Sequence, residues 1–153
     1  MKCQEFDLNH ALGVKIFEEI RLDGMVLEKG RTLNEEDIIQ LKLSGIATVY
    51  GAVMDENDLT LEAALGVVAA KLCGKNTAYA VSGDGICKIT ASVDGVFLCA
   101  DDRVAKFNRQ SHNLILNTVP PYGYVAADEV IALLELTTPL AEQAAVDLSL
   151  IHI

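Results

Sequence analysis

Two short groups of cations are the residues whose types and spacing point to ligand chemistry in this chain. Lys29-Gly30-Arg31 places two positive charges beside a flexible turn. Arg103, Lys106 and Arg109 form a second basic group at helical spacing. Because the protein carries a net charge of −10, either group is a candidate contact for an anionic ligand. The alternative is that these cations are ordinary solvated surface residues.

Three adjacent acidic pairs are candidates for general acid and base catalysis, and they are Glu18-Glu19, Glu35-Glu36 and Asp101-Asp102. Neighbouring side chains point to opposite faces of a strand, and on a helix they lie about 100° apart. Neither arrangement brings two carboxyl groups together to share a proton. The pairs are therefore interpreted as solvated surface or as helix-capping residues.

The sequence contains no pattern typical of nucleophilic catalysis or of a phosphate-binding loop. A G-x-S-x-G motif is absent, and no cysteine has an obvious electropositive context. Residues 82–88, "SGDGICK", contain two glycines but lack the lysine-serine ending of a P-loop. This segment is interpreted as a turn. We therefore predict no catalytic residue in this chain.

The cysteine and histidine residues are too dispersed to predict a metal site. They are Cys3, Cys73, Cys87 and Cys99, with His10, His112 and His152, and no Cys-x-x-Cys pair occurs. We expect reduced thiols that pack as small hydrophobic side chains. Neither a metal nor a cofactor is predicted for this chain.

The overall composition is that of a folded protein with a real core. A chain of 153 residues, 51% hydrophobic and 22% charged, is long enough for one domain or two small lobes. The negative net charge opposes binding to nucleic acid or to an anionic membrane. No apolar run approaches the roughly 20 residues of a membrane span, and no apolar signal core follows Met1. We expect a soluble cytoplasmic protein.

The first part of the chain predicts several strands. Residues 3–6 and 14–20 are expected to be short strands. Asp23-Gly24 is expected to be the tight turn of a hairpin, and Lys29-Gly30 a second turn. Residues 46–54 are rich in β-branched side chains and predict a buried strand.

Two helices have clear sequence signals. Asn34 is positioned to cap a helix whose first turn, residues 35–37, is acidic, and Gly45 is expected to end it. Residues 61–72 repeat apolar side chains at the spacing of an amphipathic helix that ends at Gly74. The second helix is the strongest periodic pattern in the chain.

The pattern changes to β structure from Tyr79. Residues 87–93 alternate apolar and polar side chains, and Asp94-Gly95 is expected to join them to residues 96–100 as a hairpin. A brief helix is expected to begin at Asp101 or Asp102. Further strands are predicted at residues 113–119 and 130–136.

The last segment, residues 138–153, is predicted to begin as a helix. Thr138 is a capping residue type, and Pro139 is tolerated at the first helical position because its missing N–H is not needed there. The segment ends on the apolar run "LIHI". Since a natural C-terminus seldom stops inside such a run, we expect that a longer protein was cut here.

Together these elements predict an α+β fold with a small strand-helix-strand lobe and a β-rich lobe, joined by an amphipathic helix. The expected boundaries are residues 1–57 for the first lobe, 58–75 for the bridging helix and 76–137 for the β-rich lobe. Residues 138–153 are expected to be a linker to a missing C-terminal domain.

Four stretches, residues 11–53, 59–74, 91–108 and 114–136, resemble the N-terminal region of molybdopterin-binding proteins. These are relatives of molybdopterin molybdenumtransferase, some of them fused to a molybdenum-cofactor nucleotidyltransferase. The likeness covers nearly the whole chain. Its most specific features are Glu62 with Ala63-Ala64, Asp94-Gly95, Asn108 after the basic helix, and Thr118 before the double proline.

The resemblance implies that the pterin-binding and catalytic motifs belong to an α/β domain that follows the linker and is absent here. By implication this chain is a non-catalytic accessory part that shapes or dimerises the molecule. Molybdopterin or its nucleotide form would be bound by the missing domain of the parent protein. The candidate ligand contacts in this chain are Lys29, Gly30, Arg31 and Arg103, with Asn108 and Thr118 added by the resemblance.

The chain departs from the family at two places, and two other functions remain open. The family often has a histidine-containing motif where this chain has Phe17-Glu18-Glu19. It also often has a glycine turn near Asp128-Glu129, where this chain has no glycine turn. One alternative is a free-standing module that binds a small anionic ligand or a partner through Lys29 and Arg103. Another is a homo-oligomerisation domain that uses an apolar face of the 61–72 helix.

Overall fold

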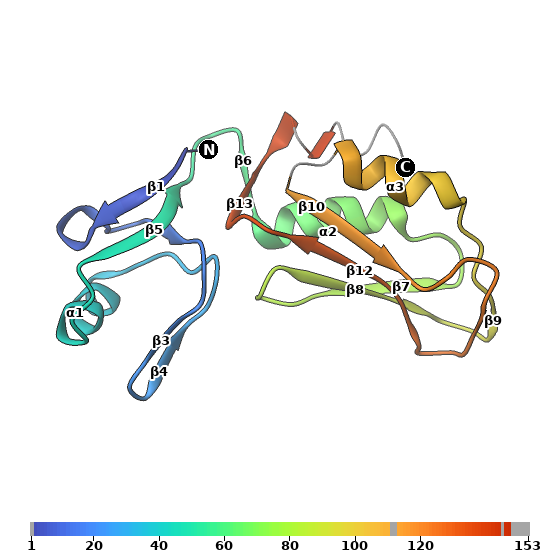
Figure 1. Cartoon of the computed structure of the whole chain (residues 1–153), viewed down its shortest axis with the longest axis horizontal. Coiled ribbons are helices and arrows are strands. Elements are labelled where there is room, and N and C mark those ends of the chain that lie inside the picture. The colour runs from blue at the N-terminus through green and yellow to red at the C-terminus, as the bar shows by residue number, and fades with distance from the viewer. Residues whose placement is uncertain (1, 111–112, 145, 148–153) are drawn as a thin grey trace.

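The computed structural model describes residues 2–110, 113–144 and 146–147, and within them the chain forms two lobes (Figure 1). The fold is α+β, as the sequence predicts. The first lobe extends to residue 53 and the second begins at residue 58, so residues 54–57 connect them. Each lobe has its own cluster of buried apolar side chains, which means that two small cores stabilise the molecule.

The first lobe is built on a three-stranded antiparallel sheet in the order β1-β5-β2. The predicted Asp23-Gly24 hairpin is confirmed as β3 and β4, with Gly24 at a φ of +83°. The strand predicted at 14–20 is interrupted: Lys15–Ile16 form β2, and Ile20 already belongs to β3. The elements are β1 (Lys2–Asp7), the 3-10 helix η1 (Leu8–His10), β2 (Lys15–Ile16), β3 (Ile20–Leu22), β4 (Met25–Leu27), α1 (Glu35–Leu43) and β5 (Thr48–Val53).

The helix α1 begins as the sequence predicts. The Asn34 side chain accepts a hydrogen bond from the Asp37 N–H, and the Asp37 carboxylate accepts one from the Asn34 N–H. This reciprocal capping box satisfies backbone donors that a helix start leaves without partners. At the other end Gly45 takes a φ of +77°, the left-handed conformation that commonly follows a helix.

The second lobe is built on a four-stranded antiparallel sheet in the order β10-β12-β8-β7. The predicted helix is confirmed as α2, whose buried residues contact one face of this sheet. The elements are β6 (Asp58–Thr60), α2 (Leu61–Leu72), β7 (Thr77–Val81), β8 (Ile86–Ala91), β9 (Gly95–Val96), α3 (Asp101–Gln110), β10 (Leu114–Thr118), β11 (Tyr124–Val125), β12 (Val130–Leu136) and β13 (Leu140–Glu142).

The alternating pattern of β8 is confirmed, but the hairpin predicted after it is wrong. Cys87, Ile89 and Ala91 are buried on the covered face of the sheet. β8 lies between β7 and β12, so both of its edges are already paired. The residues after Asp94 therefore form β9, which pairs with the distant strand β11.

The helix predicted from Pro139 is also wrong at its start. Residues 140–142 form β13, which pairs with β6, and Leu140 and Ala141 are buried. The Thr138 hydroxyl donates to the Leu140 carbonyl oxygen at 2.5 Å instead of accepting from a helix N–H. The segment expected to be a linker thus begins with a strand of the second lobe. Its last residues, 148–153, lie outside the described part of the chain.

The helices are short in this molecule. Within the described residues, none has the length and apolar character needed to cross a lipid bilayer.

Candidate functional site

The segment Glu28 to Arg31, named here the KGR turn, lies where the two lobes meet. The Arg31 N–H donates to the Glu28 carbonyl oxygen at 3.1 Å, and Gly30 has a φ of +79°. A positive φ at the third position is typical of a type II turn, which favours glycine there. The turn is tied to β2, because the Gly30 N–H donates to the Ile16 carbonyl oxygen at 2.9 Å.

Lys29 reaches from the first lobe into the second. Its Nζ donates to the Leu136 carbonyl oxygen, at the end of β12, over 2.6 Å. Burial lowers the pKa of the Lys29 ammonium, while the carboxylates of Glu135 and Asp84 in the second lobe act in the opposite direction. A partly buried ammonium is most stable where a nearby oxygen accepts a hydrogen bond from it. Lys29 is therefore a polar link between the two cores.

Arg31 turns back into its own lobe and binds the helix α1. Its Nε and Nη2 donate to the two carboxylate oxygens of Asp37 at 3.0 and 2.9 Å. Burial alone would raise the pKa of the Asp37 carboxyl, but the hydrogen bonds from Arg31 and from the Asn34 N–H hold that pKa below its usual value. The bidentate pair fixes the KGR turn to the start of α1.

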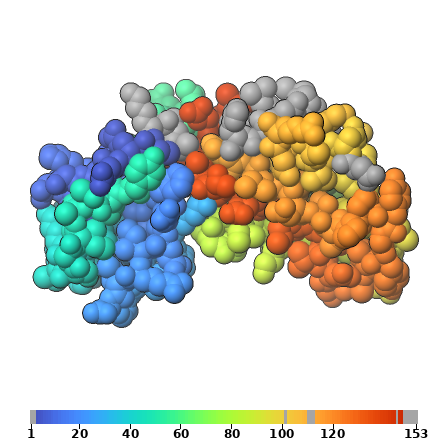
Figure 2. Space-filling view, in the orientation of Figure 1, coloured from blue at the N-terminus to red at the C-terminus, as the bar shows by residue number. Residues whose placement is uncertain are grey.

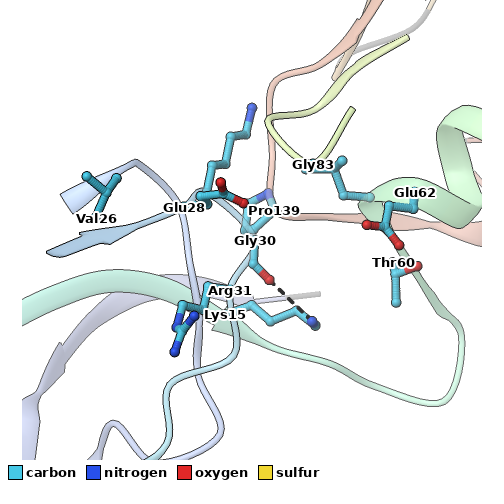
Figure 3. A pocket seen from close by; sticks show the side chains of 11 residues that line it. Lys15, Val26, Glu28, Gly30, Arg31, Thr60, Glu62, Gly83 and Pro139 are labelled. Atoms are coloured by element: carbon cyan, nitrogen blue, oxygen red, sulfur yellow. Dashed lines mark hydrogen bonds between the residues drawn. The ribbon is translucent and has the colours of Figure 1, made fainter. Parts of the chain in front are cut away.

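Lys15 contacts the KGR turn from β2. Its Nζ lies 3.3 Å from the Gly30 carbonyl oxygen, shown as a dashed line in Figure 3, and 2.9 Å from the Thr32 hydroxyl. The sequence analysis did not select Lys15, because its neighbours in sequence give no sign of the pairing that places it beside Thr32.

A cleft of about 490 Å³ lies between the KGR turn and the second lobe (Figure 3). Figure 2 shows the surface indented between the two lobes. Three cations and two carboxylates contribute to its walls. The lining residues are Lys15, Val26, Glu28, Lys29, Gly30, Arg31, Thr60, Leu61, Glu62, Gly83 and Pro139.

Two glycines keep the second-lobe wall of the cleft close to the KGR turn. A Cβ at Gly85 would lie 3.0 Å from the Leu136 carbonyl oxygen and 3.3 Å from the Lys29 Nζ. A Cβ at Gly83 would lie 3.4 Å from the Glu28 carboxylate. Both glycines belong to the turn between β7 and β8, which is the role that the sequence predicts for residues 82–88. The absence of side chains at Gly83 and Gly85 lets the two lobes pack closely here.

The cleft presents mixed charge to solvent. Lys29 and Arg31 already donate hydrogen bonds within the protein, and Glu28 and Glu62 balance part of the positive charge. Such a lining can attract an anionic group through Lys15 and the outer faces of the other two cations. Within residues 2–110, 113–144 and 146–147, no group of three or more His, Cys, Asp or Glu residues is arranged to hold a metal ion.

The other predicted ligand contacts lie away from the cleft. Arg103 is exposed on α3. The Asn108 amide donates to the Leu116 carbonyl oxygen at 2.9 Å and accepts from the Leu116 N–H at 2.8 Å, so it fixes α3 to β10. Thr118 lines a separate cavity in the second lobe. The structure therefore brings together Lys29, Gly30 and Arg31 but not the remaining three.

Several cleft residues were missed by the sequence analysis. Thr60 and Glu62 stand at the start of α2, where Thr60 accepts a hydrogen bond from the Ala63 N–H at 3.3 Å as the capping residue. Pro139 comes from the opposite end of the chain, and it was interpreted as a helix start. These residues lie beside the KGR turn because of contacts between distant segments, and no local sequence pattern predicts such contacts.

In comparisons with known proteins, no protein family, curated protein or solved structure matches this chain.

Proposed function

We propose that this chain is a non-catalytic scaffold within a molybdopterin-binding protein of molybdenum cofactor biosynthesis. The sequence resemblance supports the family, and the Lys29 contact with Leu136 supports the scaffold role. In this proposal the two lobes form one platform that positions, or dimerises, a pterin-binding domain carried elsewhere in the parent protein. That parent is a relative of molybdopterin molybdenumtransferase or a fusion to a cofactor nucleotidyltransferase.

The strongest argument for a scaffold is the internal use of the KGR turn. Lys29 donates to the second lobe, Arg31 to Asp37, and the Gly30 carbonyl oxygen accepts from Lys15. A Cβ at Gly30 would lie 3.5 Å from the Leu61 side chain, so the turn also packs closely on α2. These three groups of the turn therefore position other parts of the same protein.

The cleft residues fit an anionic group better than a pterin ring. Lys15 and Arg31 offer charge for a phosphate, whereas the lining residues consist of charged, small and aliphatic side chains. A pterin would need a stacking surface and amide-like partners for its ring nitrogens and oxygen. We therefore assign the ring system to the parent protein's other domain and derive no reaction step in this chain.

A turnover assay tests the non-catalytic part of the proposal. Purified chain is incubated with adenylylated molybdopterin, Mg²⁺ and molybdate, and release of AMP is followed by chromatography. We expect release no faster than in protein-free buffer. Release that depends on the chain, and that disappears in a Lys29→Met variant of normal fold, would contradict the proposal.

Limited proteolysis tests the scaffold part. Glu56 is exposed in the connection between the lobes, where a glutamate-specific protease can cut. Loss of the Lys29 link should free the connection and speed cleavage at Glu56 in Lys29→Met. The matched control is Lys42→Met, because the Lys42 Nζ donates to Asn9 within the first lobe. Equal cleavage rates in the two variants would argue against the link.

A second candidate function is binding of a small anion in the cleft. The observation that favours it is the gathering of Lys15, Lys29 and Arg31 around one cavity in a protein whose net charge is −10. Phosphate-bearing ligands favour such sites, because both attraction and hydrogen bonding act on them.

Calorimetric titration with pyrophosphate tests this candidate. We expect Lys15→Met to weaken binding and the exposed control Lys71→Met, on α2, to leave it unchanged. Absence of measurable heat at low ionic strength, or equal affinity in the two variants, would exclude the cleft as an anion site.

A further inference from the structure

A second cavity, of about 530 Å³, lies in the second lobe, and its lining includes β9, which Figure 1 shows at the end of that lobe away from the first lobe. It is named here the distal cavity. Its floor is the covered face of the four-stranded sheet, and its side walls are the end of α2 and the segment that contains β9. The residues that form it most directly are Leu72, Ile89, Ala91, Phe97, Leu116 and Val125.

Several wall residues of the distal cavity are apolar side chains of the buried core. Ile89 and Ala91 are 4% exposed, and Leu116 and Val125 are 6% exposed. They belong to the same buried cluster as the core of the lobe. The cavity is thus a gap at the end of an organised core, with walls positioned by the sheet ladder.

The rim of the distal cavity is unusually apolar for a surface. Val93, Val96 and Leu98 are 46%, 58% and 72% exposed, and all three line the opening. Exposed apolar side chains gathered at one concave place commonly mark a binding site. Isolated apolar residues on a surface would carry no such meaning.

The polar residues that line the distal cavity are Lys75, Asn76, Thr77, Asp94, Cys99 and Thr118. The Asp94 carboxylate accepts a hydrogen bond from the Ala127 N–H at 2.8 Å, which holds the side chain in place but leaves its negative charge. Lys75 is exposed, and its ammonium has no hydrogen bond or ion pair within the described part of the chain. The Thr118 hydroxyl also lines the cavity. Lys75 is therefore the one cation among the described residues that line the cavity, beside one carboxylate, Asp94.

We propose that the distal cavity binds a small organic molecule with an apolar body and one anionic end. The apolar body would fill the space over Ile89 and Ala91, and the anionic end would remain near Lys75. The volume lies within the roughly 300–1,000 Å³ of small-molecule sites. Protein partners usually bind flatter and larger surfaces, so the concave shape favours a small ligand.

Fluorescence titration with 8-anilinonaphthalene-1-sulfonate tests the site, because this probe has an aromatic body and one negative charge. We expect saturable binding with one probe per folded chain. Ala91→Leu should fill the cavity and weaken binding by about tenfold or more. The matched control is Ala80→Leu, because Ala80 pairs with Lys88 on the opposite, exposed face of the sheet.

A second variant keeps the proposal testable if Ala91→Leu does not fold. Lys75→Met leaves the core untouched, and it should weaken binding of the sulfonate probe by about threefold to tenfold. Binding of the uncharged N-phenyl-1-naphthylamine should not change. Lys71→Met, an exposed lysine of the same lobe outside the cavity lining, serves as the control.

Three results would overturn the proposal. One is the absence of saturable binding to the folded chain. Another is equal binding by Ala91→Leu and Ala80→Leu, which would place the probe elsewhere. The third is that sedimentation shows a dimer of wild type that Ala91→Leu dissociates, since the cavity would then be occupied by a second copy of the chain.

Discussion

Each of the two lobes has a small core, and the two cores are stabilised in different ways. The first lobe buries a small apolar cluster and adds polar structure to it: the capping box of α1, the Arg31–Asp37 pair and the KGR turn. The second lobe buries a larger cluster between a four-stranded sheet and two helices. In the first lobe these polar contacts supplement the smaller of the two apolar cores.

Two glycines, one in each lobe, differ in whether a side chain could replace their hydrogen. In the first lobe Gly51 lets two strands approach, because a Cβ there would meet the Lys15 carbonyl oxygen and lie 2.5 Å from Val14 Cγ1. In the second lobe Gly66 lies in α2 with nothing within 4 Å of its Cβ position. A side chain is therefore excluded at Gly51 and tolerated at Gly66.

The largest expected effect comes from Gly51→Ala. The added methyl group would collide with backbone at the junction of β2 and β5, at a cost of about 3 kcal/mol or more in the unfolding free energy of the first lobe. Hydrogen exchange in urea, read on peptides from each lobe, should show early opening of the first lobe. In the control, Gly66→Ala should stabilise α2 by about 0.5–1 kcal/mol.

Arg31→Met should destabilise the first lobe by about 2 kcal/mol, because it leaves the buried Asp37 carboxylate without its guanidinium partner. Urea denaturation of the first lobe measures the change. Arg21 is a suitable comparison, since its pair with Glu19 is exposed to solvent. If Arg21→Met and Arg31→Met had the same effect, the polar account of this lobe would be wrong.

Asn108→Ala should weaken the second lobe by about 1–2 kcal/mol, because both backbone hydrogen bonds to Leu116 are lost. The loss should free α3 from β10 and leave the first lobe unaffected. Faster exchange of the 114–118 amides is the measurement. Asn117→Ala, an exposed neighbour on β10, should change nothing, and a shift as large as that of Asn108→Ala would contradict the assignment.

The smallest expected effect is the contribution of Asp37 to the pH dependence of the first lobe's stability. The folded protein holds the pKa of Asp37 below its ordinary value, so the stabilisation is complete above that value, about 3.9, and is lost as the pH falls through the lowered folded pKa. Urea midpoints between pH 2 and 6 should therefore fall less steeply in Asp37→Asn. Asp102→Asn, in the second lobe, should leave the first-lobe profile as it is.

What the sequence could predict depends on how far apart in the chain the interacting residues lie. The Asn34 cap of α1, the Asp23-Gly24 hairpin and the alternation of β8 depend on residues close together in the chain, so local patterns predicted them. The pairing of β9 with β11 and of β13 with β6 joins distant segments, and both were missed. Pairing energy between distant strands leaves no periodic signal in either strand alone.

The candidate site shows the same limit. The charge and turn of Lys29-Gly30-Arg31 were visible in the sequence. The group that accepts the hydrogen bond from Lys29, however, is a backbone carbonyl oxygen 107 positions away. A backbone oxygen has no residue-type signature, so no pattern could have identified it. Asn108 was selected by resemblance, whereas its bonds to Leu116 give it a structural role that residue type alone does not reveal.

The most direct test of this account is the distance between the lobes. Nitroxide labels introduced by amber suppression at Glu36 and Lys71, both exposed, would report one distance by pulsed electron resonance. If the Lys29 side chain holds the lobes in one arrangement, wild type and Lys42→Met should give a single narrow distribution and Lys29→Met a broad one. A narrow, unshifted distribution in Lys29→Met would contradict the claim.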